Sequence, residues 1–204
     1  MRKEVTDIHQ LDFGKSYSYD DYLSWKLEGR IELIRGKISY VPSAPSLGHQ
    51  QLSGELYFQE GSYLKKNKCK VFSAPFDVHL PSPQLEDSDT VVQPDLCVVC
   101  DPAKLDRRGC HGAPDWVIEI LSPSTAHKDL NEKFQLYQLV GVPEYWVVFP
   151  FERSLAVYLL NEEGHYQSLQ PQPFTVPNQV PCHTLPGLSI DMEAIFEGLE
   201  DEDF

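Results

Sequence analysis

The sequence predicts an α/β fold in which helices flank a central mixed β-sheet. Segments with strand-like patterns alternate with segments that have helical spacing, which is typical of such folds. The runs 115–121 and 144–149 are apolar enough to be buried strands. The chain has 204 residues, which is enough for one sizeable domain and too few for two.

The first part of the chain predicts helix, hairpin, then helix. Residues 18–28 have helical spacing and precede a glycine that is a plausible stop. Residues 31–35 and 37–41 alternate around Gly36, which indicates a β-hairpin. Apolar and aromatic side chains recur at helical intervals through residues 46–66, so we expect an amphipathic helix there.

The middle of the chain predicts strands interrupted by loops. Short strands are expected near residues 70–73 and 76–80, followed by a polar, proline-containing loop over 81–89. Residues 91–100 are expected to contain a buried strand, and the charge-rich stretch 101–112 is expected to be an excursion from the sheet.

The last part of the chain predicts a strand, a helix and an antiparallel meander. The strand at 115–121 leads into a helix over 126–140 that ends at Gly141. Residues 144–149 and 154–160 are expected to pair, and residues 186–196 predict a loop, a strand and a short closing helix. We divide the chain into an arm (1–17), one domain (18–196) and an acidic tail (197–204).

The charge balance argues against contact with nucleic acid, because phosphate contacts need Lys and Arg. The chain has a net charge of −14. Seven acidic residues and no basic residue lie in 191–204, which leaves a net charge of −7 for the rest. Cations bound at a carboxylate cluster would offset part of the local negative potential.

The cysteines and the N-terminal segment indicate the cellular compartment in which the protein is expected. The chain has five cysteines, and their spacing predicts no disulfide framework. Cys97 and Cys100 would point to opposite faces of a strand, so small buried cysteines are favoured over a zinc site. The N-terminus is polar and no run is long and apolar enough to span a bilayer, so we expect a cytoplasmic protein without membrane contact.

Asp95, Glu119 and Lys133 are the candidates for chemistry. Asp95 opens one predicted strand, Glu119 lies near the end of the next, and Lys133 is on the helix that follows. Two carboxylates at the ends of adjacent strands suit a hard cation such as Mg²⁺, and a lysine can stabilise charge that develops on phosphorus. Glu32, on the first strand, is a possible third acid.

Each candidate also has a structural interpretation. Asp95 could be a turn acid, whereas Glu119 within an apolar strand would be costly unless paired or bound to a metal. Taken alone, Lys133 is expected on the surface in a pair with Asp129, four residues earlier. Tyr137 could belong to the core. His49 is expected near a helix start, and its part in the site is left open.

The order of several motifs resembles the Uma-type restriction endonuclease family, formerly a domain of unknown function, within the PD-(D/E)xK nuclease superfamily. The resemblance covers about residues 18–196. Its most specific parts are the runs 119–125 (Glu-Ile-Leu-Ser-Pro-Ser-Thr) and 141–146 (Gly-Val-Pro-Glu-Tyr-Trp). The remaining matching motifs are Tyr22-Leu23, residues 31–37, His49, residues 92–95, Asp129, Lys133 and Tyr137.

The resemblance implies a restriction-endonuclease-like sandwich. It implies that Asp95 and Glu119 hold Mg²⁺ or Mn²⁺, with Glu32 as a further catalytic acid. In the superfamily motif a lysine lies two residues after the glutamate, where this chain has Leu121. The resemblance implies that Lys133 takes that role from the next helix. Phe149 is a second departure, because such proteins commonly carry an acid there.

Three functions follow as hypotheses. The first is a Mg²⁺- or Mn²⁺-dependent endonuclease that hydrolyses phosphodiester bonds in DNA, for which we expect a homodimer. The second is a non-catalytic nucleic-acid-binding or regulatory module that keeps the fold, in line with the acidic balance. The third is a metal-dependent hydrolase of another phosphoester. No serine nucleophile elbow and no His-Glu-x-x-His motif occurs in the sequence, which argues against those chemistries.

Overall fold

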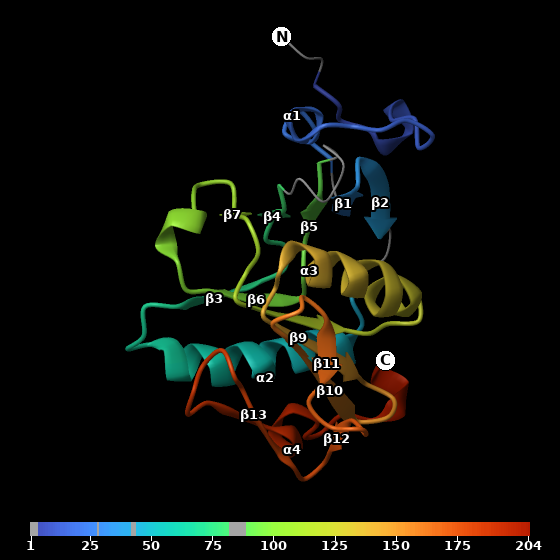
Figure 1. Ribbon diagram of the computed structural model, residues 1–204. Coiled ribbons are helices and arrows are strands. Elements are labelled where there is room, and N and C mark those ends of the chain that lie inside the picture. The colour runs from blue at the N-terminus through green and yellow to red at the C-terminus, as the bar shows by residue number, and fades with distance from the viewer. Residues whose placement is uncertain (1–3, 28, 42–43, 82–88) are drawn as a thin grey trace.

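The protein was analysed as a computed structural model, which describes residues 4–27, 29–41, 44–81 and 89–204. Two β-sheets lie one above the other in Figure 1, and a two-stranded ribbon, β13 (Gln179–Pro181) with β14 (Ser189–Asp191), packs near the C-terminal end. The expected α/β sandwich with a central mixed sheet is confirmed.

The larger sheet has the strand order β11-β10-β9-β8-β6-β3, and β12 pairs with β10 beside it. Strands β8 and β9 run parallel, whereas β6 and β10 are antiparallel to these neighbours, so the sheet is mixed. The strands are β3 (Lys70–Ser73), β6 (Leu96–Val99), β8 (Trp116–Ile120), β9 (Glu144–Phe149), β10 (Ser154–Leu160), β11 (Tyr166–Ser168) and β12 (Phe174–Thr175).

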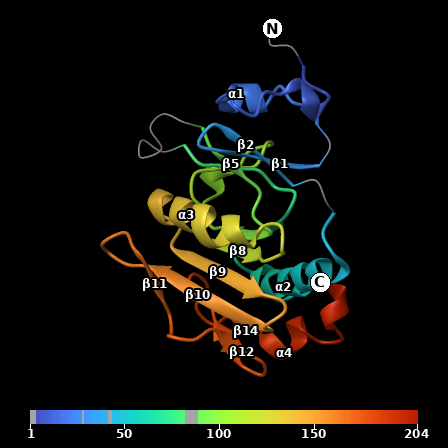
Figure 2. The same ribbon diagram turned by 90° about the vertical axis from the view of Figure 1, so that its right-hand side faces the viewer.

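Helices cover both faces of this sheet. Helix α2 (Leu47–Leu64) lies on one face and α3 (Phe134–Val140) on the other, as Figures 1 and 2 show. Successive side chains of a strand point to opposite faces, so β8 contributes to two cores. Ile118 packs in the core on the α2 side, and Val117 packs in the core on the α3 side. Glu119 lies two residues after Val117 in the same strand, so its side chain points to the same face, toward α3.

The smaller sheet has the order β2-β1-β5-β4-β7 and carries the N-terminal hairpin at one edge. Its strands are β1 (Arg30–Ile34), β2 (Lys37–Val41), β4 (Val78–His79), β5 (Val91–Val92) and β7 (Cys110–His111). The hairpin is confirmed. Arg35 (φ 49°) and Gly36 (φ 75°) form its turn, and consecutive positive φ values are what a two-residue hairpin turn requires.

The buried strand predicted within 91–100 is confirmed as β6, and the segment also holds a second short strand, β5, that belongs to the other sheet. Strand β5 pairs with β1 in the smaller sheet, and β6 pairs with β8 and β3 in the larger one. Gln93, Pro94 and Asp95 form the crossing between them. Pro94 has no N–H to give to a ladder, which suits such a break. The crossing leaves Asp95 where the two sheets meet.

The helix predicted over 126–140 is present, but its first half is wound differently. Lys128–Lys133 is π-helical, and α3 follows over Phe134–Val140, with Gly141 as its C-cap at a left-handed φ of 84°. The helix predicted over 18–28 is shorter: α1 spans Tyr19–Tyr22, capped by Ser18. The chain then bridges to the N-terminal arm, where the Lys26 N–H bonds the Val5 carbonyl at 2.7 Å.

The C-terminal prediction is confirmed, with β14 followed by the short helix α4 (Met192–Ile195). The loop predicted over 81–89 falls largely on residues 82–88, outside the described residues. The division of the chain at residue 197 stays a prediction. Leu199, beyond that point, is 2% exposed and belongs to the core on the α2 side.

The cysteines give one correction. Cys69 and Cys100 form a disulfide, although the spacing predicted none. The register of β3 and β6 pairs Lys70 with Val99, which brings the residues just outside both strands together. Cys97 lies in the core on the α3 side and Cys100 packs on the α2 side, so their expected opposite orientation is confirmed. Within the described residues, no helix is long and apolar enough to cross a membrane.

Candidate active site

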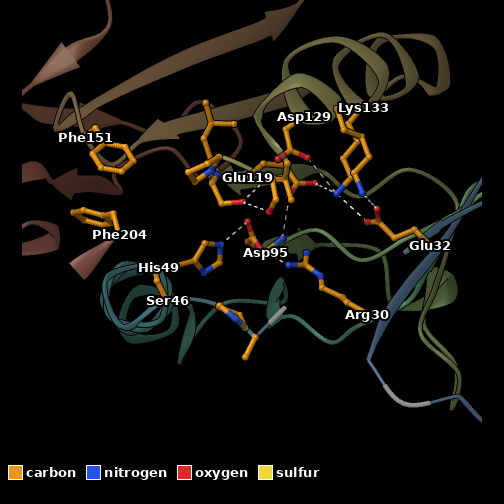
Figure 3. Close-up of a pocket in the computed structure, with 18 residues that line it drawn as sticks. Arg30, Glu32, Ser46, His49, Asp95, Glu119, Asp129, Lys133, Phe151 and Phe204 are labelled. Atoms are coloured by element: carbon orange, nitrogen blue, oxygen red, sulfur yellow. Dashed lines mark hydrogen bonds and ion pairs between the residues drawn. The ribbon is translucent and has the colours of Figure 1, made fainter. Parts of the chain in front are cut away.

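Side chains from both sheets, α2 and the π-helical segment meet around one cavity of about 240 Å³ (Figure 3). All four predicted site residues line it: Glu32, Asp95, Glu119 and Lys133. They come from β1, the crossing before β6, β8 and the π-helical segment, so only the packed fold brings them together.

Asp95 is held by donors from three directions. Its Oδ2 accepts the Ile120 N–H at 2.8 Å and lies 3.3 Å from His49 Nε2, and its Oδ1 accepts Arg30 Nη1 at 2.8 Å. The side chain is buried, which by itself would raise the pKa of this carboxyl. Hydrogen bonds from His49 and Ile120 and the charge of Arg30 outweigh burial and hold that pKa well below its usual range.

Glu119 is 1% exposed. Its side chain faces α3, because side chains along β8 alternate between the two faces of the sheet. Its Oε1 accepts hydrogen bonds from Lys133 Nζ and from the Tyr137 hydroxyl, both at 2.8 Å. Its Oε2 lies 3.4 Å from the Asp95 N–H. Burial raises the pKa of Glu119 to about 7, with Asp129 and Asp95 acting in the same direction and Lys133 against them. A buried acid within an apolar strand is thus paired, as its cost demands.

Glu32 forms ion pairs with two lysines of the π-helical segment. Lys128 Nζ lies 2.7 Å from Oε2, and Lys133 Nζ lies 2.9 Å from Oε1. The hydrogen bonds of a π-helix join residues five apart, so these two lysines come onto one side of the segment. Burial favours the neutral acid, but Lys133, Lys128 and the Gln93 N–H together lower the pKa of Glu32 to about 2.

The surface expectation for Lys133 is wrong. The side chain is 2% exposed and contacts the three carboxylates of Glu32, Glu119 and Asp129, the last at 3.6 Å. These charges outweigh desolvation and raise the pKa of Lys133, so the ammonium stays protonated. Tyr137 is fully buried, as the core interpretation had it, and it also donates to Glu119.

Reasoning from the sequence missed Arg30 and Lys128 and left His49 open. His49 begins α2 next to the Ser46 cap and points at Asp95 (Figure 3). Its pKa is lowered by burial and raised more strongly by Asp95, with a net rise. The five-residue interval from Lys128 to Lys133 could have revealed Lys128 only with the π-helix known. No pattern in the sequence around Arg30 marks it as a residue of the site.

The mouth of the cavity is lined by aromatic rings and hydroxyls. Phe151 and Phe204 lie side by side, with ring centroids 5.7 Å apart, and Ser122–Thr125 line the rim between strand β8 and the helix. Phe204 packs over Gly48, where a Cβ would lie 2.6 Å from its ring. The acidic C-terminal residues therefore lie beside the cavity. Phe149, the second departure from the family pattern, does not line it.

The donor set fits a hard divalent cation. Four buried carboxylates face three permanent cations and His49, which leaves one negative charge uncompensated when that imidazole is neutral. Asp129 Oδ1 is buried without a hydrogen-bond donor. Among the described residues, no three His, Cys, Asp or Glu side chains form a ready-made metal cluster. Mg²⁺ commonly uses one or two carboxylates plus water, so Asp95 and Glu119 would suffice as protein ligands.

Comparison with known proteins shows a family and a fold that the chain shares. Residues 19–193 match the family described as "Uma2: Putative restriction endonuclease". The chain is 26% identical over 185 residues to "Uncharacterized protein slr1290" of Synechocystis sp., an alignment that covers 89% of this chain and 92% of that protein. The crystal structure of "a putative nuclease belonging to DUF820" from Anabaena variabilis superposes with a TM-score of 0.68 at 21% identity, over 88% of this chain and 97% of the other.

Proposed function

Because this chain belongs to the Uma2 restriction endonuclease family, we propose that it is a Mg²⁺- or Mn²⁺-dependent endonuclease that hydrolyses phosphodiester bonds in DNA. One observation carries the proposal. Lys133 lies in a buried ion pair with Glu119, whose carboxylate adjoins Asp95 at the edge of a cavity. In the proposal these residues act as the acid–acid–lysine set that the family resemblance implies, with the lysine supplied by the helix after β8.

In this proposal, Asp95 and Glu119 hold the metal. When bound there, Mg²⁺ supplies Lewis acidity toward a phosphate oxygen and makes a bound water more acidic. Lys133 donates a hydrogen bond to the negative charge that develops on the phosphate during attack by water. The water oxygen bonds to phosphorus and gives up a proton to solvent, the bond between phosphorus and the sugar oxygen breaks, and the sugar oxygen takes up a proton from solvent as it leaves. Glu32 positions Lys133 and keeps its ammonium protonated.

Two further cations suit phosphate contact. Arg30 Nη1 forms an ion pair with Asp95, and Lys128 Nζ forms one with Glu32. Both cationic residues line the cavity. A metal bound at Asp95 would compete with Arg30 for that carboxylate and free the guanidinium. A planar guanidinium matches the geometry of phosphate oxygens and can bind two of them at once. Local cations of this kind would offset the net charge of −14 at the site of contact.

The test combines metal binding with cleavage. Calorimetric titration of Mg²⁺ and Mn²⁺ is compared for the wild type, Asp95→Asn, Glu119→Gln and Lys133→Met, with Glu162→Gln in an exposed turn as the matched control. Supercoiled plasmid is then incubated with each protein in the same buffers. We expect metal binding in the wild type, the control and Lys133→Met. Cleavage is expected only in the wild type and the control.

Other outcomes decide between the hypotheses. Cleavage that persists in the Asp95, Glu119 and Lys133 variants would refute the site. Metal binding without cleavage of DNA or of an oligoribonucleotide would favour the non-catalytic module. Cleavage of the oligoribonucleotide alone would favour another phosphoester. An absence of metal binding, even with DNA present, would contradict the assignment of the two carboxylates.

The same proposal includes a homodimer, because cutting both strands of a duplex calls for two sites. Sedimentation equilibrium over a range of protein concentrations tests it. A species of twice the 23.3 kDa chain mass is expected, and a monomer at all concentrations, with and without DNA, would contradict it.

A further inference from the structure

A pair of histidines lies at the edge of the smaller sheet. Strands β4 and β7 are parallel neighbours, and their register places His79 directly opposite His111. Opposite residues of paired strands point to the same face. The two rings turn their Nδ1 atoms toward each other at 3.4 Å, with ring centroids 5.5 Å apart and ring planes at 90°. Neither ring lines the catalytic cavity.

The outer nitrogen of each ring faces a carboxylate. His79 Nε2 lies 3.4 Å from Asp89 Oδ1, and His111 Nε2 lies 3.2 Å from Asp106 Oδ2. A carboxylate only accepts, so each Nε2 carries the proton of its neutral ring. Both Nδ1 lone pairs then point into the same space, and a proton or a metal ion between them would relieve their repulsion.

Within the described residues, one of the two rings is covered and the other is more open. Tyr19 stacks on His79, with centroids 3.8 Å apart and planes at 10°, and covers that ring. The His79 side chain is 12% exposed and the His111 side chain is 34% exposed, so an ion can approach from the side of His111. Burial lowers the pKa of His79, and His111 adds to this against the effect of Asp89. A lowered pKa favours the neutral imidazole that metals bind.

We propose that His79 and His111 form a second metal site, which binds a transition-metal ion of the Zn²⁺ class through the two Nδ1 atoms. Zinc–nitrogen bonds of about 2.0–2.1 Å in a tetrahedron separate two nitrogens by about 3.3–3.4 Å, which the pair meets without movement. Asp89 and Asp106 orient the rings as carboxylates do behind metal-bound histidines.

The chemistry of the ligands sets this site apart from the catalytic one. Imidazole suits Zn²⁺, Cu²⁺ and Ni²⁺, whereas Mg²⁺ and Mn²⁺ prefer oxygen. Among the described residues, no third His, Cys, Asp or Glu side chain joins the pair. A bound ion would link β7 (Cys110–His111), the edge strand of the smaller sheet, to its neighbour β4.

The experiment uses ZnCl₂ as the probe and the full chain with Asp95→Asn and Glu119→Gln, which removes the other carboxylate site. Calorimetry and thermal unfolding are recorded with and without Zn²⁺ for this background, for added His111→Gln and Asp106→Asn, and for added His165→Gln. His165 is exposed in the loop between β10 and β11 and is the matched control. One Zn²⁺ per chain and a rise in Tm are expected in the background and the control.

Two of the variants should lose this response to different degrees. His111→Gln should abolish the saturable binding and the Tm shift, and Asp106→Asn should weaken binding about tenfold or more. Equal binding in His111→Gln, or none in the background, would overturn the proposal. If His111→Gln fails to fold, ring ¹⁵N spectra of the unsubstituted chain decide. Zn²⁺ should shift the Nδ1 signals of His79 and His111, and unchanged signals there would refute the site.

Discussion

Lys133 Nζ and Glu119 Oε1 lie 2.8 Å apart, with both side chains 2% or less exposed. The lysine comes from a π-helical segment and the glutamate from the middle of the larger sheet. Glu32, from the smaller sheet, contacts the same ammonium at 2.9 Å. One buried cation therefore links three elements, and its removal should affect stability as well as chemistry.

Lys133→Met should destabilise the fold strongly. Methionine fills a similar volume but leaves buried carboxylates without their shared cation, which typically costs about 3–5 kcal/mol. Urea unfolding at neutral pH measures this. The control is Lys15→Met, whose ion pair with Asp12 is exposed, so a loss of less than about 1 kcal/mol is expected there. Equal losses of unfolding free energy in the two variants would show that the buried ion pair contributes no more to stability than the exposed one.

Glu119 should make stability depend on pH. Its pKa of about 7 in the folded chain lies above the ordinary value of 4.5. Between those values the folded state binds more protons than the unfolded state, so this group lowers the free energy of unfolding as pH rises. In metal-free buffer, the stability of the wild type relative to Glu119→Gln should fall across that window. A constant difference would contradict the raised pKa.

Metal binding should depend on the same proton. Below about pH 7 a metal must displace the proton on Glu119, so affinity for Mg²⁺ should rise by up to about tenfold per pH unit and then level off. Calorimetry in buffers of different ionisation enthalpy measures both the affinity and the protons released. Binding that neither changes with pH nor releases protons would argue that Glu119 is not a ligand.

Arg30→Gln should strengthen metal binding while it weakens phosphate binding. The guanidinium occupies Asp95 Oδ1, so its removal frees a ligand atom. We expect a lower Kd for Mg²⁺ without DNA and weaker affinity for an uncleaved DNA analogue. The comparison variant is Lys128→Gln, whose partner Glu32 is not one of the proposed metal ligands. An unchanged Kd for Mg²⁺ in Arg30→Gln would mean that the pair with Asp95 does not compete with the metal.

The disulfide can be counted chemically. Cys97, Cys110 and Cys182 are free and buried, and Cys69 is joined to Cys100. Under denaturing conditions we expect three titratable thiols per chain, and five after reduction. The crosslink closes a loop with a sequence separation of 31, so the Cys69→Ser/Cys100→Ser variant should lose roughly 3 kcal/mol of stability. Five thiols before reduction would show that the bond does not form.

Elements with strong local signals were predictable from the sequence. Helix α2 has its Ser46 cap and apolar spacing, and the hairpin has Gly36 at its turn. Strand β8 is a continuous apolar run broken only by Glu119. That break was informative because a lone acid in such a run is costly without a partner. Asp95 and Lys133 entered through the resemblance to a family more than through their own surroundings.

The remainder depended on contacts between distant segments. The run 91–100 has no local mark of belonging to two sheets, because strand pairing is decided by partners such as β1 and β8. The burial of Lys133 depends on the carboxylates of Glu32 and Glu119, which approach from other elements. Arg30 lies 65 residues from Asp95 in the sequence, so no local pattern records their pair.

The sequence alone determined the fold class and most elements and marked Glu119 as a candidate acid, because apolar periodicity and the cost of burying a charge are properties of each segment. Only the tertiary structure decided how that acid is paired, which other acids lie beside it and which cations face them. Which side chains share one buried space depends on how the two sheets and the helices pack, and that arrangement is set by the whole chain at once.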